Sequence, residues 1–540
     1  MAVRGGAVAL AVALVAAGAA SAILGGVRAP DAGRETAYWL AVESLAIDGD
    51  ARLEEVDRAR FAERFGRRPE LAQVVADEDG AQLASPWLWT RIAALVRARA
   101  GHVAVRLLQS SLVAWTAFVA AATLASRVGG GSAGWLVGVA LFASAAFAAG
   151  FRMEPRALEM AAMASAAAAI WYRRLGPARP ADDVYRGALD ARPTALRWLV
   201  AGGCGGVVAA ASPSYLPLLA PLVVAAPAGR RGRAGALFAA GVAVVVAGLV
   251  ALGGAPWEPI AAAVSAPLYG WAALGLLLGR GIGLVPYFVP ALLLVGLGGR
   301  REGKQWVVPA VAGALALQLA LAPFDFVDGG LARGNAWFLP PLALLLLAVE
   351  SSESPRATLA VGVVGLPLLL AAWLAAVGAD RAAEAVGARL GAVERVLPLA
   401  STLRWQPGVA ELRRGAVVAR GVAPGLVGDD GGLVLRGARG ELMVTSDRPL
   451  ASVRLELGRD APAKVVVRGA TLGNVIYRPN GEVAIDIELT ERRARRHPVW
   501  WSPGGAWTYA FGLRCEPPPA RPVAIELAFG RPLLTTGGTR

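Results

Sequence analysis

Residues 234–252 read AGALFAAGVAVVVAGLVAL, a run without a charged side chain. A helix needs about 20 apolar residues to cross the roughly 30 Å hydrocarbon layer of a bilayer, so this stretch predicts a transmembrane helix. Similar runs recur up to residue 378, and 56% of the 540 residues are hydrophobic whereas 17% are charged. The sequence therefore predicts a polytopic α-helical membrane protein and not a soluble globular one.

We expect about eleven transmembrane helices in all. The apolar segments that predict them cover approximately residues 6–26, 104–126, 133–150, 157–172, 197–212, 214–227, 234–252, 283–298, 306–322, 336–349 and 356–378, with a further short one at 269–280. The first segment also resembles a signal peptide, but a multispanning body needs an insertion start, which favours an uncleaved first helix.

The net charge of +14 comes largely from Arg residues between the apolar runs. They gather in segments 173–197, 230–233 and 300–304, and the positive-inside rule predicts that these segments face the cytoplasm. The N-terminus is then cytoplasmic, whereas segment 27–103 and everything after about residue 379 are extracytoplasmic. Because the sequence has no basic stripe interleaved with aromatic residues, the expected partner of this charge is membrane lipid and not nucleic acid.

The last quarter of the chain has a different pattern. Val483, Ile485 and Ile487 alternate with polar or small residues, a period of two that predicts half-buried strands, and Asn480-Gly481 just before them predicts a hairpin. Further strands are expected near 416–422, 432–436, 441–445, 451–457, 463–468 and 507–514. We therefore expect an extracytoplasmic all-β, sandwich-like domain over residues 405–540, joined by an amphipathic helical connector at 379–404 to a transmembrane domain at 1–378.

Aromatic residues in this β domain offer a sugar-stacking surface. Trp500, Trp501 and Trp507 lie close in sequence to a run of arginines, and aromatic rings stack on sugars. Packing of these rings into a small sandwich core is the better-favoured alternative.

Acidic residues follow a helix-like segment in the extracytoplasmic loop 27–103. Asp48-Gly49-Asp50 places two carboxylates around one glycine, and hard oxygen ligands of this kind suit Mg²⁺ or Mn²⁺. A helix C-terminal turn with solvated acids explains the same spacing, because Asp and Gly dominate turns, and it is favoured about two to one.

Three stretches resemble bacterial GT-C superfamily membrane glycosyltransferases of the polyprenyl-phosphate-sugar-dependent, mannosyltransferase-like kind. They are residues 38–50 (YWLAVESLAIDGD), 279–288 (GRGIGLVPYF) and 334–340 (GNAWFLP). The resemblance is scattered over about residues 1–378 and does not extend to the β domain. It implies a GT-C-like fold in a bacterial inner (cell) membrane and a polyprenyl-phosphate-linked sugar as donor.

The resemblance also implies a catalytic residue. The family carries an acidic pair a few residues before a tyrosine in its first extracytoplasmic loop. Here Tyr38 stands at the place of that tyrosine and Glu35 at the place of the second acid, but Arg34 replaces the first acid. Removing a proton from an acceptor hydroxyl needs a carboxylate within hydrogen-bond reach, so Glu35 is the expected base, with Asp31 as a weaker alternative.

Substrate-binding residues are expected around this base, and each has a plainer explanation. Arg280 lies between glycines in an apolar stretch. Binding to a phosphate and a position in an interfacial loop explain it equally well. Glu154, in the charged hairpin 151–156, faces either a sugar or its neighbouring arginines. Asn335 and Trp337 suit sugar binding by hydrogen bonding and stacking, although an interfacial Trp is more often a membrane anchor. Tyr38, Asp48 and Asp50 complete the expected set.

The function expected from these features is transfer of a sugar from a polyprenyl-phosphate donor to an extracytoplasmic glycan, lipid or protein acceptor. The alternative, favoured by Arg34, is a non-catalytic GT-C-like protein that binds a lipid-linked glycan or scaffolds envelope assembly. A transporter is a third class, but the sequence shows no internal repeat of the kind transporters have. His102 and His497 are far apart in the chain, which argues against a histidine-based zinc site or a Ser/His/Asp hydrolase.

Overall fold

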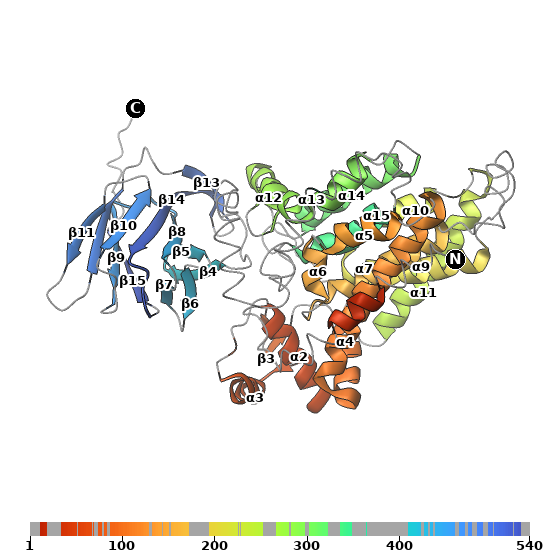
Figure 1. Ribbon diagram of the computed structural model, residues 1–540, viewed down its shortest axis with the longest axis horizontal. Helices are drawn as coiled ribbons and strands as arrows, with labels where there is room; N and C mark the ends of the chain where they lie inside the picture. The colour runs from red at the N-terminus through yellow and green to blue at the C-terminus, as the bar shows by residue number, and fades with distance from the viewer. Residues whose placement is uncertain are drawn as a thin grey trace. The chain divides into compact units, whose positions relative to one another are not determined.

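The computed structural model divides the chain into two compact units (Figure 1). The first is formed by Met1–Ala262, Leu276–Ala322 and Phe326–Pro398, and the second by Ala263–Gly275, Pro323–Asp325 and Leu399–Arg540. The structure describes residues 11–18, 34–50, 52–66, 69, 74–77, 80–83, 87–128, 132–142, 144–150, 153–171, 194–224, 226, 228–251, 266–279, 282–297, 302–321, 335–347, 363, 409–422, 426–429, 432–435, 438–458, 464–469, 473–477, 483–489, 495–499, 502–521 and 523–530.

Helices dominate the part of the chain before residue 348. In chain order they are α2 (Arg34–Ile47), α3 (Glu55–Phe65), α4 (Trp87–Val128), α5 (Ser132–Phe142), α6 (Ala145–Ala149), α7 (Arg156–Trp171), α9 (Ala195–Ala211), η1 (Pro213–Leu219), α10 (Ala220–Val224), η2 (Ala228–Arg230), α11 (Arg231–Ala251), α12 (Ala266–Leu278), α13 (Leu284–Leu297), α14 (Glu302–Leu321), η3 (Ala336–Phe338) and α15 (Leu339–Leu347). A small antiparallel sheet of β1 (Arg52–Leu53), β3 (Gly80–Leu83) and β2 (Val74–Asp77) lies beside α2.

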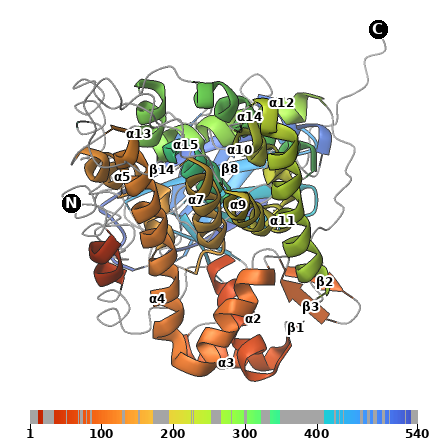
Figure 2. The ribbon, with the colours of Figure 1, turned by 90° about the vertical axis from the view of Figure 1, so that its right-hand side faces the viewer.

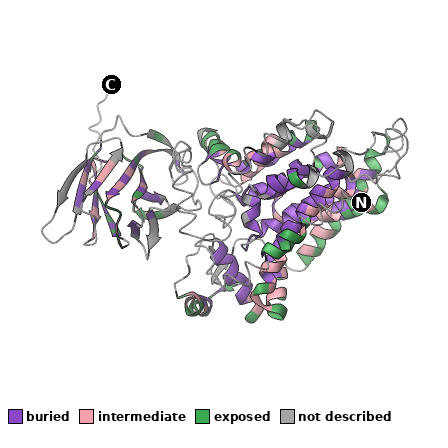
Figure 3. Ribbon diagram, in the orientation of Figure 1, coloured by how far each residue is buried: buried purple, intermediate pink, exposed green. Residues whose placement is uncertain are grey.

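Helix α7 is the centre of the helical unit. It packs against α4, α9 and α15, and most of its residues are buried, as Figure 3 shows. Its sequence, RALEMAAMASAAAAIW, is rich in alanine, which lets neighbouring helices approach closely. Figure 2 shows α2 and α3 at one end of α4.

Helices α9 and α11 approach each other closely. A Cβ atom on Gly202 would lie 2.1 Å from the carbonyl oxygen of Phe238, and one on Gly241 would lie 2.4 Å from that of Leu199. Both positions therefore require glycine, since any larger residue would push the two backbones apart.

The prediction of about eleven transmembrane helices is wrong. Within the described ranges, two helices are long and apolar enough to cross a membrane, Leu88–Ala125 and Arg231–Ala251. The apolar run at 133–150 is divided between α5 and α6, and the run at 214–227 begins as a 3₁₀ helix containing Pro217. Alanine, glycine and proline make these runs apolar without making each one a long helix, so hydropathy alone counted too many spans.

The prediction of a β-rich C-terminal part is confirmed, and its strands form two sheets. One has the order β10-β14-β8-β5-β4, with β13 also pairing with β14, and the other has the order β11-β12-β9-β15-β7-β6. The strands are β4 (Val409–Arg414), β5 (Val417–Val422), β6 (Leu426–Asp429), β7 (Gly432–Leu435), β8 (Arg439–Ser446), β9 (Ser452–Leu457), β10 (Lys464–Gly469), β11 (Gly473–Tyr477), β12 (Val483–Glu488), β13 (Arg495–Val499), β14 (Ser502–Glu516) and β15 (Val523–Phe529).

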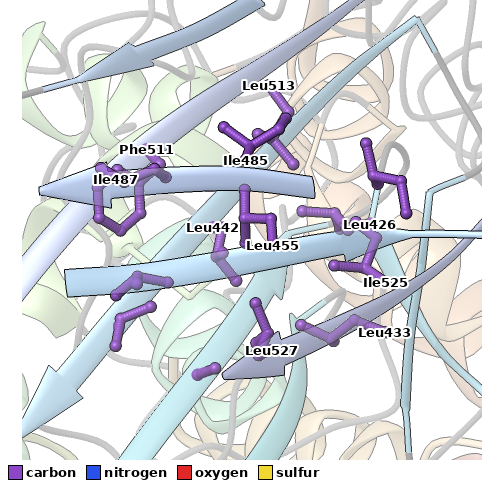
Figure 4. Packing of buried hydrophobic residues seen from close by; sticks show 14 of the residues in the cluster. Leu426, Leu433, Leu442, Leu455, Ile485, Ile487, Phe511, Leu513, Ile525 and Leu527 are labelled. Atoms are coloured by element: carbon purple, nitrogen blue, oxygen red, sulfur yellow. The ribbon is translucent and has the colours of Figure 1, made fainter. Parts of the chain in front are cut away.

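Both sheets contribute alternate residues to one hydrophobic core, so this part of the chain is a β-sandwich (Figure 4). Leu442 and Phe511 come from the first sheet, and Leu455 and Ile525 from the second. The hairpin expected around Asn480-Gly481 is present as the antiparallel pair β11 and β12, with Tyr477 opposite Val483. The turn itself and the connector expected at 379–404 lie outside the described residues.

The outer faces of the two sheets differ. On β5 and β8, Val418, Arg420, Met443 and Thr445 alternate with the core positions and are themselves buried, whereas on β14 Ala510 is exposed and Arg514 is half-buried. On the second sheet the corresponding positions carry exposed or half-buried charges, including an ion pair between Arg454 and Asp486. The outer face of the first sheet is therefore partly buried, whereas that of the second sheet is open and charged.

Candidate functional site

The residue expected to act as the base lies near the start of α2 and is buried. Glu35 is 7% exposed, and one of its carboxylate oxygens accepts a hydrogen bond of 3.2 Å from the backbone N–H of Met153. Tyr38, one turn further along α2, is also buried, and its ring meets that of Trp89 edge to face. The first extracytoplasmic segment expected from the sequence thus contacts the hairpin around residue 153.

Gln109 on α4 holds this hairpin. Its side-chain amide donates to the carbonyl oxygens of Ala149, at 2.9 Å, and Glu154, at 2.5 Å, while its own oxygen accepts from the indole N–H of Trp89, at 3.1 Å. The Gln109 side chain therefore fixes the hairpin backbone against α4 in a region that excludes water. Glu154 in turn accepts a hydrogen bond from the backbone N–H of Arg156.

A second group of contacts joins the hairpin to the segment around residue 337. The guanidinium of Arg156 donates to both carboxylate oxygens of Glu159, at 2.8 and 2.7 Å, and lies 5.5 Å from the ring centroid of Tyr215. The Tyr215 hydroxyl donates to the carbonyl oxygen of Trp337, at 2.9 Å, and the two rings stack with their centroids 5.2 Å apart.

The side chains of Asn335 and Trp337 lie in the same group. The Asn335 side-chain oxygen accepts from the backbone N–H of Trp337 and so caps η3. The indole N–H of Trp337 donates to the Ser214 hydroxyl, which lies 2.7 Å from the hydroxyl of Ser212. Glu35, Tyr38, Glu154, Asn335 and Trp337, expected from three distant segments, are thereby linked by one continuous series of buried contacts, which we call the central network.

Asp48 and Asp50 lie outside the central network. Both are exposed in the turn that ends α2, where Gly49 has a φ of 82° and the amides of residues 48 and 49 donate to the carbonyl of Ser44. The guanidinium of Arg60 donates to both oxygens of Asp48, and this bond holds the pKa of Asp48 below its ordinary value. Asp50 accepts from the Ser44 hydroxyl instead.

This geometry opposes cation binding at the Asp48-Asp50 turn, because Mg²⁺ or Mn²⁺ would first have to displace Arg60 from Asp48. Among the residues that the structure describes, no group of three or more His, Cys, Asp or Glu side chains is arranged to hold a metal ion. Arg280, the expected phosphate-binding residue, lies outside the described ranges.

A second polar cluster was not anticipated from the sequence. Glu43 on α2, only 3% exposed, faces Arg97 and His102 on α4. Nε2 of His102 lies 2.5 Å from one carboxylate oxygen, and Nε and Nη2 of Arg97 each lie 3.2 Å from a carboxylate oxygen. The ring of Trp39 stacks on that of His102. Burial alone would raise the pKa of Glu43, but its contacts with His102 and Arg97 outweigh burial, and the pKa lies below its ordinary value.

The position of His102 depends on a break in α4. Gly101 has a φ of 81° and non-helical geometry, so α4 consists of two helical pieces that meet at this residue. A side chain at position 101 would be strained at this φ, which explains the glycine. The glycine immediately before His102 is the feature of the sequence that could have indicated this break.

No family model, curated protein or solved structure matches this chain.

Proposed function

We propose that this chain is a membrane glycosyltransferase, which transfers a sugar from a polyprenyl-phosphate donor to an extracytoplasmic acceptor hydroxyl. The observation that supports it is the central network. Residues expected from resemblance to be catalytic or sugar-binding are far apart in sequence, yet contacts through Gln109, Arg156 and Tyr215 join them.

In this reaction the acceptor oxygen forms a bond to the anomeric carbon while the bond from that carbon to the phosphate oxygen breaks. The leaving group is polyprenyl phosphate, and the acceptor proton passes to Glu35. A carboxylate held at a fixed position by the Met153 amide is suited to this role, provided that its second oxygen meets the acceptor.

The surface of α11 supports a location in the membrane. Within the most apolar 18 residues of α11 only 17% are buried, compared with 61% in α4. Val244 is 72% exposed and Val250 is 49% exposed. A continuous exposed apolar helix is costly in water and favourable in lipid, so we place α11 in contact with the bilayer.

One observation favours a second candidate, a non-catalytic protein that binds a lipid-linked glycan. Glu35 is buried and bonded to the hairpin backbone, which is also what a purely structural carboxylate would do. Arg34, at the position of the family's first acid, is consistent with this alternative.

The test uses the purified full-length chain in detergent and a panel of polyprenyl-phosphate sugars, with release of polyprenyl phosphate as the readout. Glu35→Gln is the decisive variant, because the amide oxygen still accepts from the Met153 N–H while the basic carboxylate is gone. We expect turnover to fall by about 100-fold or more, with an unchanged midpoint of thermal unfolding. Asp48→Asn, at the exposed turn, is the matched control and should keep turnover within about twofold, given its distance from the network.

Three outcomes separate the candidates. Turnover that requires Glu35 supports the transferase with this base, and turnover that survives Glu35→Gln assigns the proton transfer to another group. If the unmodified chain binds donors and releases no polyprenyl phosphate from any of them, the non-catalytic candidate is correct.

A further inference from the structure

The cluster around Glu43 carries more positive than negative charge. One carboxylate oxygen of Glu43 lies 3.2 Å from Nε of Arg97 and 3.9 Å from Nη1 of Arg64, so two guanidinium groups converge on a single acid. Arg106 lies near enough to act electrostatically on Arg64. The Glu43 carboxylate balances one of the two guanidinium charges of Arg64 and Arg97, which leaves this pair with a net positive charge.

Arg64 is the member of the cluster that is open to an incoming anion. Its side chain is 31% exposed, and its contacts are the 3.9 Å ion pair with Glu43 and the faces of Trp39 and Phe65, each with the ring centroid 5.8 Å away. Stacking on an aromatic ring fixes the plane of a guanidinium while leaving its edge N–H groups available. Burial lowers the pKa of Arg64; the charge of Glu43 opposes this effect, and the charges of Arg97 and Arg106 add to it, so a bound anion would offset part of the repulsion between the arginines.

The cluster lies at one end of an apolar helix. After Arg106, residues 107–125 of α4 contain no charged side chain and are long enough to cross the hydrocarbon layer. If this piece of α4 spans a bilayer, Arg97 and His102 lie at the level of the lipid phosphates.

We propose that Arg64 and Arg97, with Glu43 and His102 behind them, form a binding site for a phosphate-bearing anion. Guanidinium groups bind phosphate oxygens through paired N–H donors, and the positive charge that Glu43 leaves unbalanced favours a phosphate group. This site is separate from the central network, and it does not rest on the proposed sugar transfer, because binding requires no turnover.

The experiment is calorimetric titration of the purified full-length chain in detergent with three probes. They are short-chain dihexanoyl phosphatidic acid, inorganic phosphate and zwitterionic dihexanoyl phosphatidylcholine. Binding of phosphatidic acid alone identifies a lipid phosphate as the ligand, and binding of inorganic phosphate as well identifies a soluble phosphate anion. Saturable binding of neither anion, or equal binding of the zwitterionic lipid, overturns the proposal.

Two arginines of the same helix give the matched comparison. Arg64→Gln should weaken phosphate binding by about tenfold or more, since it removes a charge-assisted contact, and Arg64→Lys should recover part of the affinity. Arg58→Gln, which removes a charge paired with Glu55 on the exposed side of α3, should change the affinity by less than about twofold. Equal affinities for the Arg64→Gln and Arg58→Gln variants, both folded by circular dichroism, would exclude Arg64 from the site and overturn the proposal.

Discussion

Replacing Gln109 by methionine should destabilise the helical unit through lost hydrogen bonds and not through lost volume. The two side chains are similar in length, but methionine has no donor for the carbonyls of Ala149 and Glu154 and only a weak acceptor for the Trp89 indole N–H. Three buried polar groups would lose their partners. At about 1 kcal/mol for each, the expected cost is about 3 kcal/mol.

Gln109→Glu sharpens this test. Glutamate keeps an acceptor for Trp89, but it places a carboxylate against the two carbonyl oxygens to which Gln109 donates. It should cost at least as much as the methionine variant, although it is more polar. If the site simply tolerated polar side chains better than apolar ones, the methionine variant would be the less stable of the two.

The assay is thermal unfolding in detergent followed by tryptophan fluorescence, together with deuterium exchange of peptides that cover residues 149–156. We expect the midpoint to fall by several degrees and the hairpin amides to exchange faster. Ser111→Ala, at an exposed position on the same helix, is the control. If Gln109→Met unfolds within a degree of the Ser111→Ala variant, the Gln109 hydrogen bonds do not stabilise the hairpin and the reasoning is wrong.

Three further predictions follow from individual side chains. The folded-state pKa of Glu43 lies below its ordinary value of 4.5, so its contacts stabilise the fold above pH 4.5, and this stabilisation is lost as the pH falls. In the Glu43→Gln variant the midpoint of thermal unfolding should therefore fall less steeply as the pH is lowered below 4.5. Glu411→Gln should cost about 2 kcal/mol in denaturant unfolding, because the buried guanidinium of Arg420, 2% exposed, would lose its ion pair with Glu411, and an unchanged unfolding midpoint would refute this. Burial raises the pKa of Cys515 to about 11, so iodoacetamide should label this thiol at pH 8 only after unfolding, and rapid labelling of folded protein, read by mass spectrometry, would contradict the buried position.

The β-sandwich could be predicted from the sequence because its signals are local. Alternation at Val483, Ile485 and Ile487 fixes which face of a strand is buried, and Asn480-Gly481 fixes which strand follows. Trp507 packs against the core, as the plainer explanation held.

The helical unit was harder to predict, because hydropathy does not distinguish a helix buried in protein from one buried in lipid. Helix α7 reads as a membrane span but is surrounded by α4, α9 and α15. The central network was partly predictable, since its outer members were chosen from the sequence. Gln109 and Tyr215, which connect them, are single polar residues in apolar runs and could not be matched with partners from spacing alone.

The ion pairs could not be predicted from the sequence either. Asp48 pairs with Arg60, which lies on the next helix, and Glu43 pairs with Arg97 more than fifty residues further along the chain. Only the turn between α2 and α3 and the packing of α2 on α4 bring these charges together. The distance between the two histidines in the sequence gives no indication that His102 contacts Glu43 and Trp39.

The buried outward-facing residues of β5 and β8 have a consequence for any attempt to produce the sandwich alone. Val418, Met443 and Thr445 are buried there although they point away from the sandwich core. Any fragment in which these positions become exposed would present Val418 and Met443 to water on two neighbouring strands, beside the charged Arg420. Such a fragment is expected to self-associate in solution, and charged substitutions at Met443 and Thr445 would be the first changes to make when designing a soluble version of the domain.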